Sequence, residues 1–171
     1  KMMNLKFQYR SANINEKAVK NLKNDKYDAL KIAKAKATHL SKKNKNKIII
    51  TFDTTILHMR KTIYKCHTKK CCKDTLKSFN NTSHNLYTGM IFMMNNSLIR
   101  SSLTKTKIVF KKNKIIDINK YVERNFNQIS TAVGCYNVEG KGKTFFKNIE
   151  KSYFNVIGID MINFLKILRS I

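Results

Sequence analysis

Apolar and polar positions divide the chain into a lysine-rich first part and a longer second part with alternating patterns. Within residues 16–40 the apolar positions recur at helical spacing, which predicts a helix with one apolar stripe. The stripe comprises Ala18, Val19, Leu22, Tyr27, Leu30, Ala33 and Ala37. Residues 41–47 (SKKNKNK) predict a charged linker. A disordered basic tail is the alternative for this part of the chain.

The middle of the chain predicts three strands. Residues 47–53 (KIIITFD), 54–66 (TTILHMRKTIYKC) and 85–96 (NLYTGMIFMMNN) are rich in β-branched and aromatic side chains. The polar stretch 67–84 between them predicts an inserted loop. Residues 101–114 (SSLTKTKIVFKKNK) end in a loop of lysines.

The last third predicts alternating helices and strands. Residues 117–129 predict a helix, with Asp117 as its N-cap, because Ile118, Val122, Phe126 and Ile129 fall on one face. Three more elements are expected after it: a strand over 130–140, a helix over 143–154 and a buried strand over 155–160. This order favours parallel pairing near the end of the chain and an α/β architecture.

The charge indicates an anionic partner. Lys and Arg number 35 against 10 Asp and Glu, a net charge of +25. Like charges repel, and binding to phosphates offsets that repulsion, so a nucleic acid is the expected partner. Lys, Asn and Ile are abundant whereas Arg is scarce, which indicates an AT-rich genome such as that of an organelle. The sequence contains no run of about 18 apolar residues, so no membrane span is expected.

The side chains that could carry chemistry do not form a recognised set. Cys66, His67, Cys71 and Cys72 lie close together but lack a CxxC pair, so free, reduced thiols in a loop are expected. We therefore predict no metal, with Cys66, Cys71 and Cys72 as the only candidates for one. The histidines are scattered through basic segments. We predict no catalytic residue and no cofactor.

Residues 140–144 (GKGKT) contain the second half of a phosphate-binding loop. The first glycine of that motif is replaced by Asn137, and an Mg²⁺-binding carboxylate is not evident. The favoured interpretation is a glycine turn that approaches an RNA backbone, with Lys141 and Lys143 on its phosphates. A plain strand-to-helix turn with solvated lysines is the alternative.

Residues 138–160 (VEGKGKTFFKNIEKSYFNVIGID) resemble the C-terminal half of small-subunit ribosomal protein eleven, the universal S-eleven family. Upstream, residues 48–59 are similar to the first hairpin of that family, with its turn at Asp53-Thr54-Thr55. Residues 109–114 (VFKKNK) are similar to its basic loop. Residues 78–82 (SFNNT) offer an alternative register for the hairpin turn.

The resemblance implies a three-layer α/β/α sandwich with a mixed five-stranded sheet, plus a basic N-terminal extension. It divides the chain into a lysine-rich, partly helical extension (1–46), an S-eleven-like domain (47–160) with an insertion near 65–84, and a divergent tail (161–171). It implies a structural constituent of the small ribosomal subunit, at the platform near the mRNA exit and E site, and not an enzyme.

The expected partners are small-subunit rRNA and neighbouring small-subunit ribosomal proteins, with mRNA nearby and no membrane. The expected location is the mitochondrion, in the matrix on the small subunit of the mitoribosome, with a gene that is itself organellar as an alternative. The residues expected to bind rRNA are Lys42, Lys43, Lys45, Lys47, Thr54, Thr55, Arg60, Lys61, Lys111, Lys112, Lys114, Gly140, Lys141, Gly142 and Lys143.

Two alternatives to the ribosomal interpretation stay open on the sequence alone. One is another organellar rRNA-binding ribosomal protein, which would share the same charge and partner. The other is a small P-loop-like NTPase, which would use residues 140–144.

Overall fold

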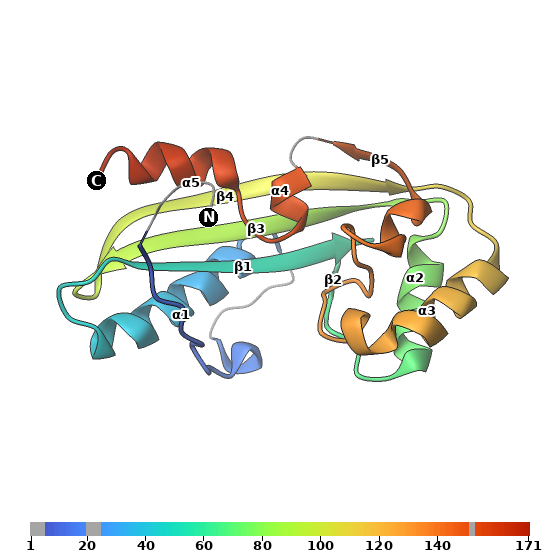
Figure 1. The fold of residues 1–171 in the computed structure, drawn as a ribbon, viewed down its shortest axis with the longest axis horizontal. Helices are drawn as coiled ribbons and strands as arrows, with labels where there is room; N and C mark the ends of the chain where they lie inside the picture. The colour runs from blue at the N-terminus through green and yellow to red at the C-terminus, as the bar shows by residue number, and fades with distance from the viewer. Residues whose placement is uncertain (1–5, 20–24, 151–152) are drawn as a thin grey trace.

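A computed structural model describes residues 6–19, 25–150 and 153–171 (Figure 1). Its centre is one five-stranded sheet with the strand order β2-β1-β3-β4-β5. All pairings between these described strands are antiparallel. The strands are β1 (Ile49–His58), β2 (Lys61–Ile63), β3 (Ser83–Met94), β4 (Ser97–Phe110) and β5 (Phe146–Glu150).

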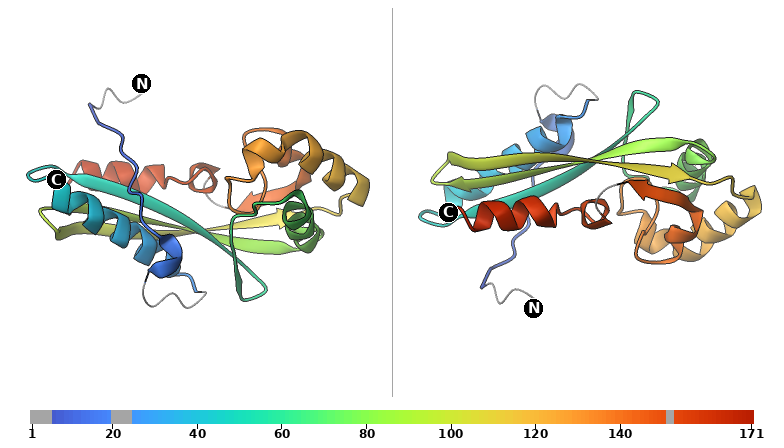
Figure 2. Two further views of the ribbon diagram at one scale, coloured as in Figure 1. Left: turned by 90° about the horizontal axis from the view of Figure 1, so that it is seen from below. Right: turned by 90° about the horizontal axis from the view of Figure 1, so that it is seen from above.

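Helices cover both faces of the sheet. The α-helices are α1 (Asp28–Lys43), α2 (Lys69–Phe79), α3 (Ile115–Ile129), α4 (Tyr153–Val156) and α5 (Met161–Leu168), with 3-10 turns η1 (Glu16–Ala18) and η2 (Lys141–Phe145). Figure 2 shows α1 and α5 on opposite faces of the long strands, and α2 beside α3 at the other end. The predicted α/β class with a five-stranded sheet is confirmed, although the sheet is antiparallel and not mixed.

Helix α1 lies unusually close to the sheet because its contact face is built of small residues. Ala33 and Ala37 pack against Ile91 and Met93 in a separate small core. On β3, a Cβ atom at Gly89 would lie 2.6 Å from Cα of Leu30, so only glycine fits beneath the helix there. This close approach brings the outer residues of α1 over β1.

The larger core lies where α2 and α3 meet the sheet. Phe79 of α2 contacts the rings of His58, His84 and Phe110. The hydroxyl of Tyr136 and Nε2 of His84 form a buried hydrogen bond of 2.9 Å. Burial, and to a lesser extent the neighbouring His58, lower the pKa of His84 to about 3, so its ring is neutral. These contacts anchor the segment after α3 to the sheet.

Two predictions in the first half are wrong. The turn expected at Asp53-Thr54-Thr55 does not exist, because β1 runs through these residues as one continuous strand. The chain reverses after it, at Met59 and Arg60, which both have positive φ angles (48° and 64°). The inserted loop expected over 67–84 contains helix α2, whose residues Cys72, Leu76 and Phe79 form a buried stripe.

Predictions for the last third were partly wrong. Helix α3 is confirmed, but its N-cap is Lys114 and not Asp117. Residues 130–140 form turns instead of a strand. The helix expected over 143–154 is replaced by the end of η2, strand β5 and the start of α4, while residues 151–152 lie outside the described part. The strand expected over 155–160 is the end of α4 and a turn.

In the N-terminal part, α1 accounts for the second half of the predicted helix and also takes in Ser41–Lys43 of the expected linker. Leu22 of the predicted stripe lies outside the described residues. Within the described part of the chain, none of the helices is long and apolar enough to cross a membrane.

Candidate active site

A cavity of about 480 Å³ opens beside the middle of β1. Strand β2 pairs only with residues 56–58 of β1, so the described strands leave residues 49–55 with one free edge. The cavity reaches both faces at this edge, because it is lined by Asp53 and by its neighbour Thr54, whose side chains point in opposite directions. Its volume is in the usual range for small-molecule sites.

Two acids at one wall of the cavity, Glu16 and Asp53, belong to an ion triad whose cation, Lys36, does not itself line the cavity. Nζ of Lys36, on α1, lies 2.6 Å from Oδ1 of Asp53 and 2.7 Å from Oε1 of Glu16. The side chain of Asp53 is only 9% exposed, that of Lys36 is 20% exposed and that of Glu16 is 42% exposed. Three separate segments, η1, α1 and β1, therefore meet at one ammonium group.

The triad contains two carboxylates and one cation, and the ionised form of the more deeply buried acid, Asp53, is destabilised. Burial, opposed by Lys36 and reinforced by Glu16, raises the pKa of Asp53 to about 6. Burial alone would lower the pKa of Lys36, but its bonds to Asp53 and Glu16 raise it above its usual value. Near neutral pH, Lys36 is thus a fixed cation, whereas Asp53 can exchange a proton.

The opposite wall is the segment that follows α3. The side chain of Asn137 accepts hydrogen bonds from the backbone N–H groups of Glu139 (2.9 Å) and Gly140 (3.3 Å). Gly142 lies directly against the backbone of Asn137, where a Cβ atom would not fit. The glycines of GKGKT therefore shape the loop that presents Glu139 to the cavity.

The floor of the cavity is held by a polar network that joins three strands to α4. The hydroxyls of Thr54 and Thr88 are 3.0 Å apart, and Thr88 also donates to the carbonyl of Asn155. The side-chain amide of Asn155 donates to Thr106 at 3.0 Å. This network fixes the turn at Gly158, which has a φ of +102° and lines the cavity.

The cavity gathers acidic residues in a chain that has few of them. Glu16, Asp53 and Glu139 line it, three of the ten acids in the sequence. Lys65 lies at the same cavity, and its charge acts on Asp53. Carboxylates beside ammonium groups in one hollow can bind a metal-complexed anion and exchange protons with it.

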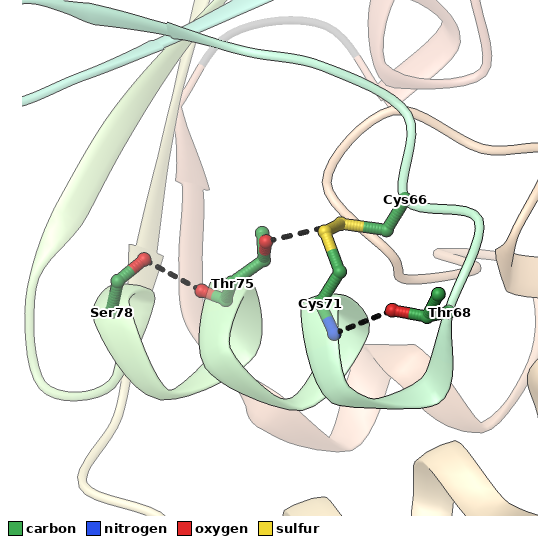
Figure 3. The surroundings of a disulfide bond; sticks show 5 residues. All are labelled: Cys66, Thr68, Cys71, Thr75 and Ser78. Atoms are coloured by element: carbon green, nitrogen blue, oxygen red, sulfur yellow. Dashed lines mark hydrogen bonds between the residues drawn. A yellow bond between two sulfur atoms is a disulfide. The ribbon is translucent and has the colours of Figure 1, made fainter.

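The cysteines lie beside this cavity. Cys66 and Cys71 form a disulfide (Figure 3), while Cys72 and Cys135 are buried and free. The expectation of free, reduced thiols in a loop is therefore wrong for Cys66 and Cys71, and both Cys71 and Cys72 lie in α2.

The residues expected to bind rRNA are spread over five segments of the chain. They lie at the end of α1 and after it (Lys42, Lys43, Lys45, Lys47), in β1 (Thr54, Thr55), at the β1–β2 turn (Arg60, Lys61), between β4 and α3 (Lys111, Lys112, Lys114), and at η2 (Gly140, Lys141, Gly142, Lys143). Thr54 lines the cavity beside β1, Lys143 lines a neighbouring hollow, and Lys111 and Lys112 line a third hollow between the ends of β3 and β4.

The candidate site residues Glu16, Lys36, Asp53, Lys65 and Glu139 were not identified as a set from the sequence. One signal was present in the sequence: Asp53 is the only carboxylate between positions 47 and 58, a stretch rich in β-branched residues. The resemblance to the S-eleven family placed Asp53 in a hairpin turn, and not among candidate acids.

The model of the Maf-like protein family matches residues 1–171, so this chain belongs to that family. A dTTP/UTP pyrophosphatase of Clostridium botulinum (strain Kyoto / Type A2) is 29% identical over 136 residues, which cover 77% of this chain and 69% of the relative. A 7-methyl-GTP pyrophosphatase of Brucella suis biovar 1 is 25% identical and covers 81% and 69%. A dTTP/UTP pyrophosphatase of Carboxydothermus hydrogenoformans is 28% identical and covers 82% and 75%.

These matches overturn the ribosomal interpretation. The resemblance to the S-eleven family was wrong, because a different family accounts for the whole chain. The prediction of a ribosomal constituent is therefore wrong, and so are the predicted rRNA and ribosomal-protein partners. The prediction that the chain is not an enzyme is also wrong, since the relatives are named as pyrophosphatases. The P-loop alternative fails on geometry, because residues 141–145 form the 3-10 turn η2, which is followed by strand β5 instead of a helix.

Proposed function

We propose that this protein is a nucleoside triphosphate pyrophosphatase, which hydrolyses the bond between the α- and β-phosphates and releases a nucleoside monophosphate and pyrophosphate. The observation that carries the proposal is the Asp53–Lys36–Glu16 triad at the cavity. The activity named for the relatives supports the choice of substrate class.

The charge of the cavity suits a triphosphate bound to Mg²⁺. Three carboxylates line the cavity against one ammonium group, that of Lys65, and Lys36 reaches it only through its ion pairs with Asp53 and Glu16, so a bare triphosphate would be repelled there. Its magnesium complex is less negative, and Glu16, Asp53 and Glu139 offer the oxygen atoms that Mg²⁺ prefers. The net charge of +25 would attract such an anion over a longer range.

In the proposed reaction Asp53 is the general base. A water molecule attacks the α-phosphorus, a new P–O bond forms, and the bond to the oxygen bridging to the β-phosphorus breaks. The proton of the water passes to the carboxylate of Asp53, and the bridging oxygen leaves with pyrophosphate. A base with a pKa of about 6 is mostly ionised near neutral pH yet accepts a proton more readily than an ordinary aspartate.

Lys36 positions this base and does not receive the proton. Its ion pair with Asp53 holds that carboxylate in place and favours its ionised form, and its ion pair with Glu16 fixes the position of the ammonium group. Lys65 is exposed at the rim, where its ammonium group can bind a phosphate that enters the cavity. Glu16, as the outermost acid of the triad, is available to the magnesium ion of the substrate.

The test uses the purified full chain with dTTP, UTP, 7-methyl-GTP and ATP in the presence of MgCl₂. Pyrophosphate is measured by adding an inorganic pyrophosphatase and detecting phosphate, with a parallel assay that omits that enzyme. The proposal expects phosphate only when the second enzyme is present. It also expects that Asp53→Asn lowers kcat by at least about 100-fold, the usual contribution of a general base.

Asp74→Asn is the matched control. Asp74 is an exposed carboxylate on α2 and does not line the cavity, so this variant should keep the wild-type rate. Equal turnover by the Asp53→Asn variant and the wild type would reject this site, and absence of turnover with every triphosphate would reject the proposed function.

A further inference from the structure

Three of the four cysteines of the chain form one buried cluster, and the fourth, Cys71, lies outside this cluster but is bonded to one of its members. Sγ atoms of Cys66, Cys72 and Cys135 all lie within 4.8 Å of one another, and Cys71 is bonded to Cys66. Cys66 follows β2, Cys71 and Cys72 lie in α2, and Cys135 comes from the turn after α3. We propose that, when the Cys66–Cys71 disulfide is reduced, these four thiolates bind one zinc ion.

The packing favours a tetrahedral metal site over a single disulfide. Three mutually adjacent sulfur atoms are one more than a disulfide uses, and Cys72 and Cys135 are buried without being joined to each other. In a Zn²⁺ site with bonds of about 2.3 Å, neighbouring sulfur atoms are about 3.8 Å apart. The three Sγ atoms need to move together by at most about 1 Å to reach that geometry.

The fourth ligand becomes available when the disulfide opens. Cys71 lies in the first turn of α2, and the Thr68 hydroxyl caps that turn by accepting a hydrogen bond from the N–H of Cys71 (Figure 3). The same helix also contacts Cys66 without the S–S bond, because Sγ of Cys66 lies 3.4 Å from the hydroxyl of Thr75 (Figure 3). Reduction takes two electrons and two protons from a dithiol, which becomes a disulfide, and zinc binding then releases four thiol protons.

Burial raises the pKa of the Cys135 thiol, so its ionisation needs the metal, and lysines near the other cysteines in the sequence can offset the negative charge of the resulting site. Lysines flank the cluster on both sides, at positions 65, 69, 70 and 73. Two of them pair with Glu123, while Lys65 and Lys70 make no ion pair among the described residues. A zinc ion with four thiolates carries a charge of about −2, which nearby ammonium groups stabilise.

The proposed zinc has a structural role at the edge of the cavity. Cys66 comes directly after Lys65, and Cys135 comes directly before Tyr136, and both of these neighbours line the cavity. One zinc ion would link helix α2 to the loop that carries Lys65 and to the loop that carries Tyr136. This inference does not depend on the reaction proposed above, because its measurements are of metal content.

The experiment reduces the full chain under anaerobic conditions with a phosphine, adds ZnCl₂, removes unbound metal by gel filtration and measures zinc by mass spectrometry. The proposal expects about one zinc per chain in the wild type and less than about a tenth of that in the Cys72→Ser and Cys135→Ser variants. His67→Ala is the control and should keep its zinc, because His67 is exposed and lies outside the cluster.

Cobalt provides a second measurement on the wild type alone, in case the serine variants fail to fold. Co²⁺ bound by four thiolates gives strong sulfur-to-cobalt charge-transfer absorption and tetrahedral d–d bands. Their absence from the reduced protein, or zinc loss in the His67→Ala variant with retention in the Cys135→Ser variant, would overturn the proposal. A metal-free protein with a Cys72–Cys135 disulfide by peptide mapping would also overturn it and indicate a thiol–disulfide device instead.

Discussion

Replacing Asp53 by Asn should remove activity and yet stabilise the folded protein at neutral pH. The folded state raises the pKa of this carboxyl from 3.8 to about 6, with burial as the main cause. Each pKa unit corresponds to about 1.4 kcal/mol, so ionised Asp53 costs the folded state about 3 kcal/mol. Asn has nearly the same shape, carries no charge and can still accept a hydrogen bond from Lys36.

The sign of the pH dependence follows from the raised pKa. Between about pH 4 and pH 6 the folded protein holds a proton on Asp53 that the unfolded chain has lost. The stabilisation due to this group is therefore fully present below about pH 4 and is lost as the pH rises through about 6. The Asp53→Asn variant should gain about 1–3 kcal/mol over the wild type at pH 8 and almost nothing at pH 4.

Urea denaturation at both pH values, followed by circular dichroism, measures this difference. The comparison of the two pH values is decisive, because a general effect of the substitution would appear at both. A variant that is less stable than the wild type at pH 8, or that shows the same gain in stability at pH 4, would refute the conclusion that burial raises the pKa of Asp53. The Asp74→Asn variant should track the wild type throughout, since this carboxylate is exposed.

Three other outcomes are expected. Gly89→Ala should lower the free energy of unfolding, measured in urea, by about 1–3 kcal/mol, because the new Cβ meets the backbone of Leu30. A loss no larger than that of the control variant Gly140→Ala would contradict the close contact between α1 and β3. Lys65→Ala should raise KM for the triphosphate about tenfold through loss of one charge-assisted contact, and an unchanged KM would remove Lys65 from the site. For the wild type, kcat/KM should fall about tenfold per pH unit below about pH 6 as Asp53 is protonated, whereas a flat profile down to pH 5 would exclude it as the base.

Strong local periodicity predicted the elements that the structure confirms. Strand β3 and helix α3 carry long, regular apolar patterns, and both were expected within a few residues of their bounds. Helix α2 could also have been found, because Cys72, Leu76 and Phe79 have helical spacing. Its lysines and threonines caused the segment to be interpreted as a polar insertion.

Other errors came from structure that only tertiary contacts decide. The β1–β2 turn uses Met59 and Arg60 at positive φ, without the glycine or asparagine that normally indicates such a turn. Residues 146–150 have the spacing of a short helix but pair with the end of β4 as an edge strand. A local pattern of five residues cannot distinguish these two states.

The candidate site could not be predicted from the sequence, for a different reason. Glu16, Lys36 and Asp53 are distant in sequence and meet only because α1 lies tightly over β1 and β3. The net charge of +25 indicated an anionic partner, but charge alone does not distinguish a large polyanion from a small phosphate ester. The mitochondrial location, inferred largely from the AT-rich composition, stays a prediction.

The most direct test of the central claim is the fate of the attacking oxygen. UTP is incubated with the full chain and MgCl₂ in water enriched in oxygen-18, and the products are analysed by mass spectrometry. Attack at the α-phosphorus predicts one heavy oxygen in UMP and none in the released pyrophosphate. Label in pyrophosphate, or products that are UDP and phosphate, would contradict the proposed reaction.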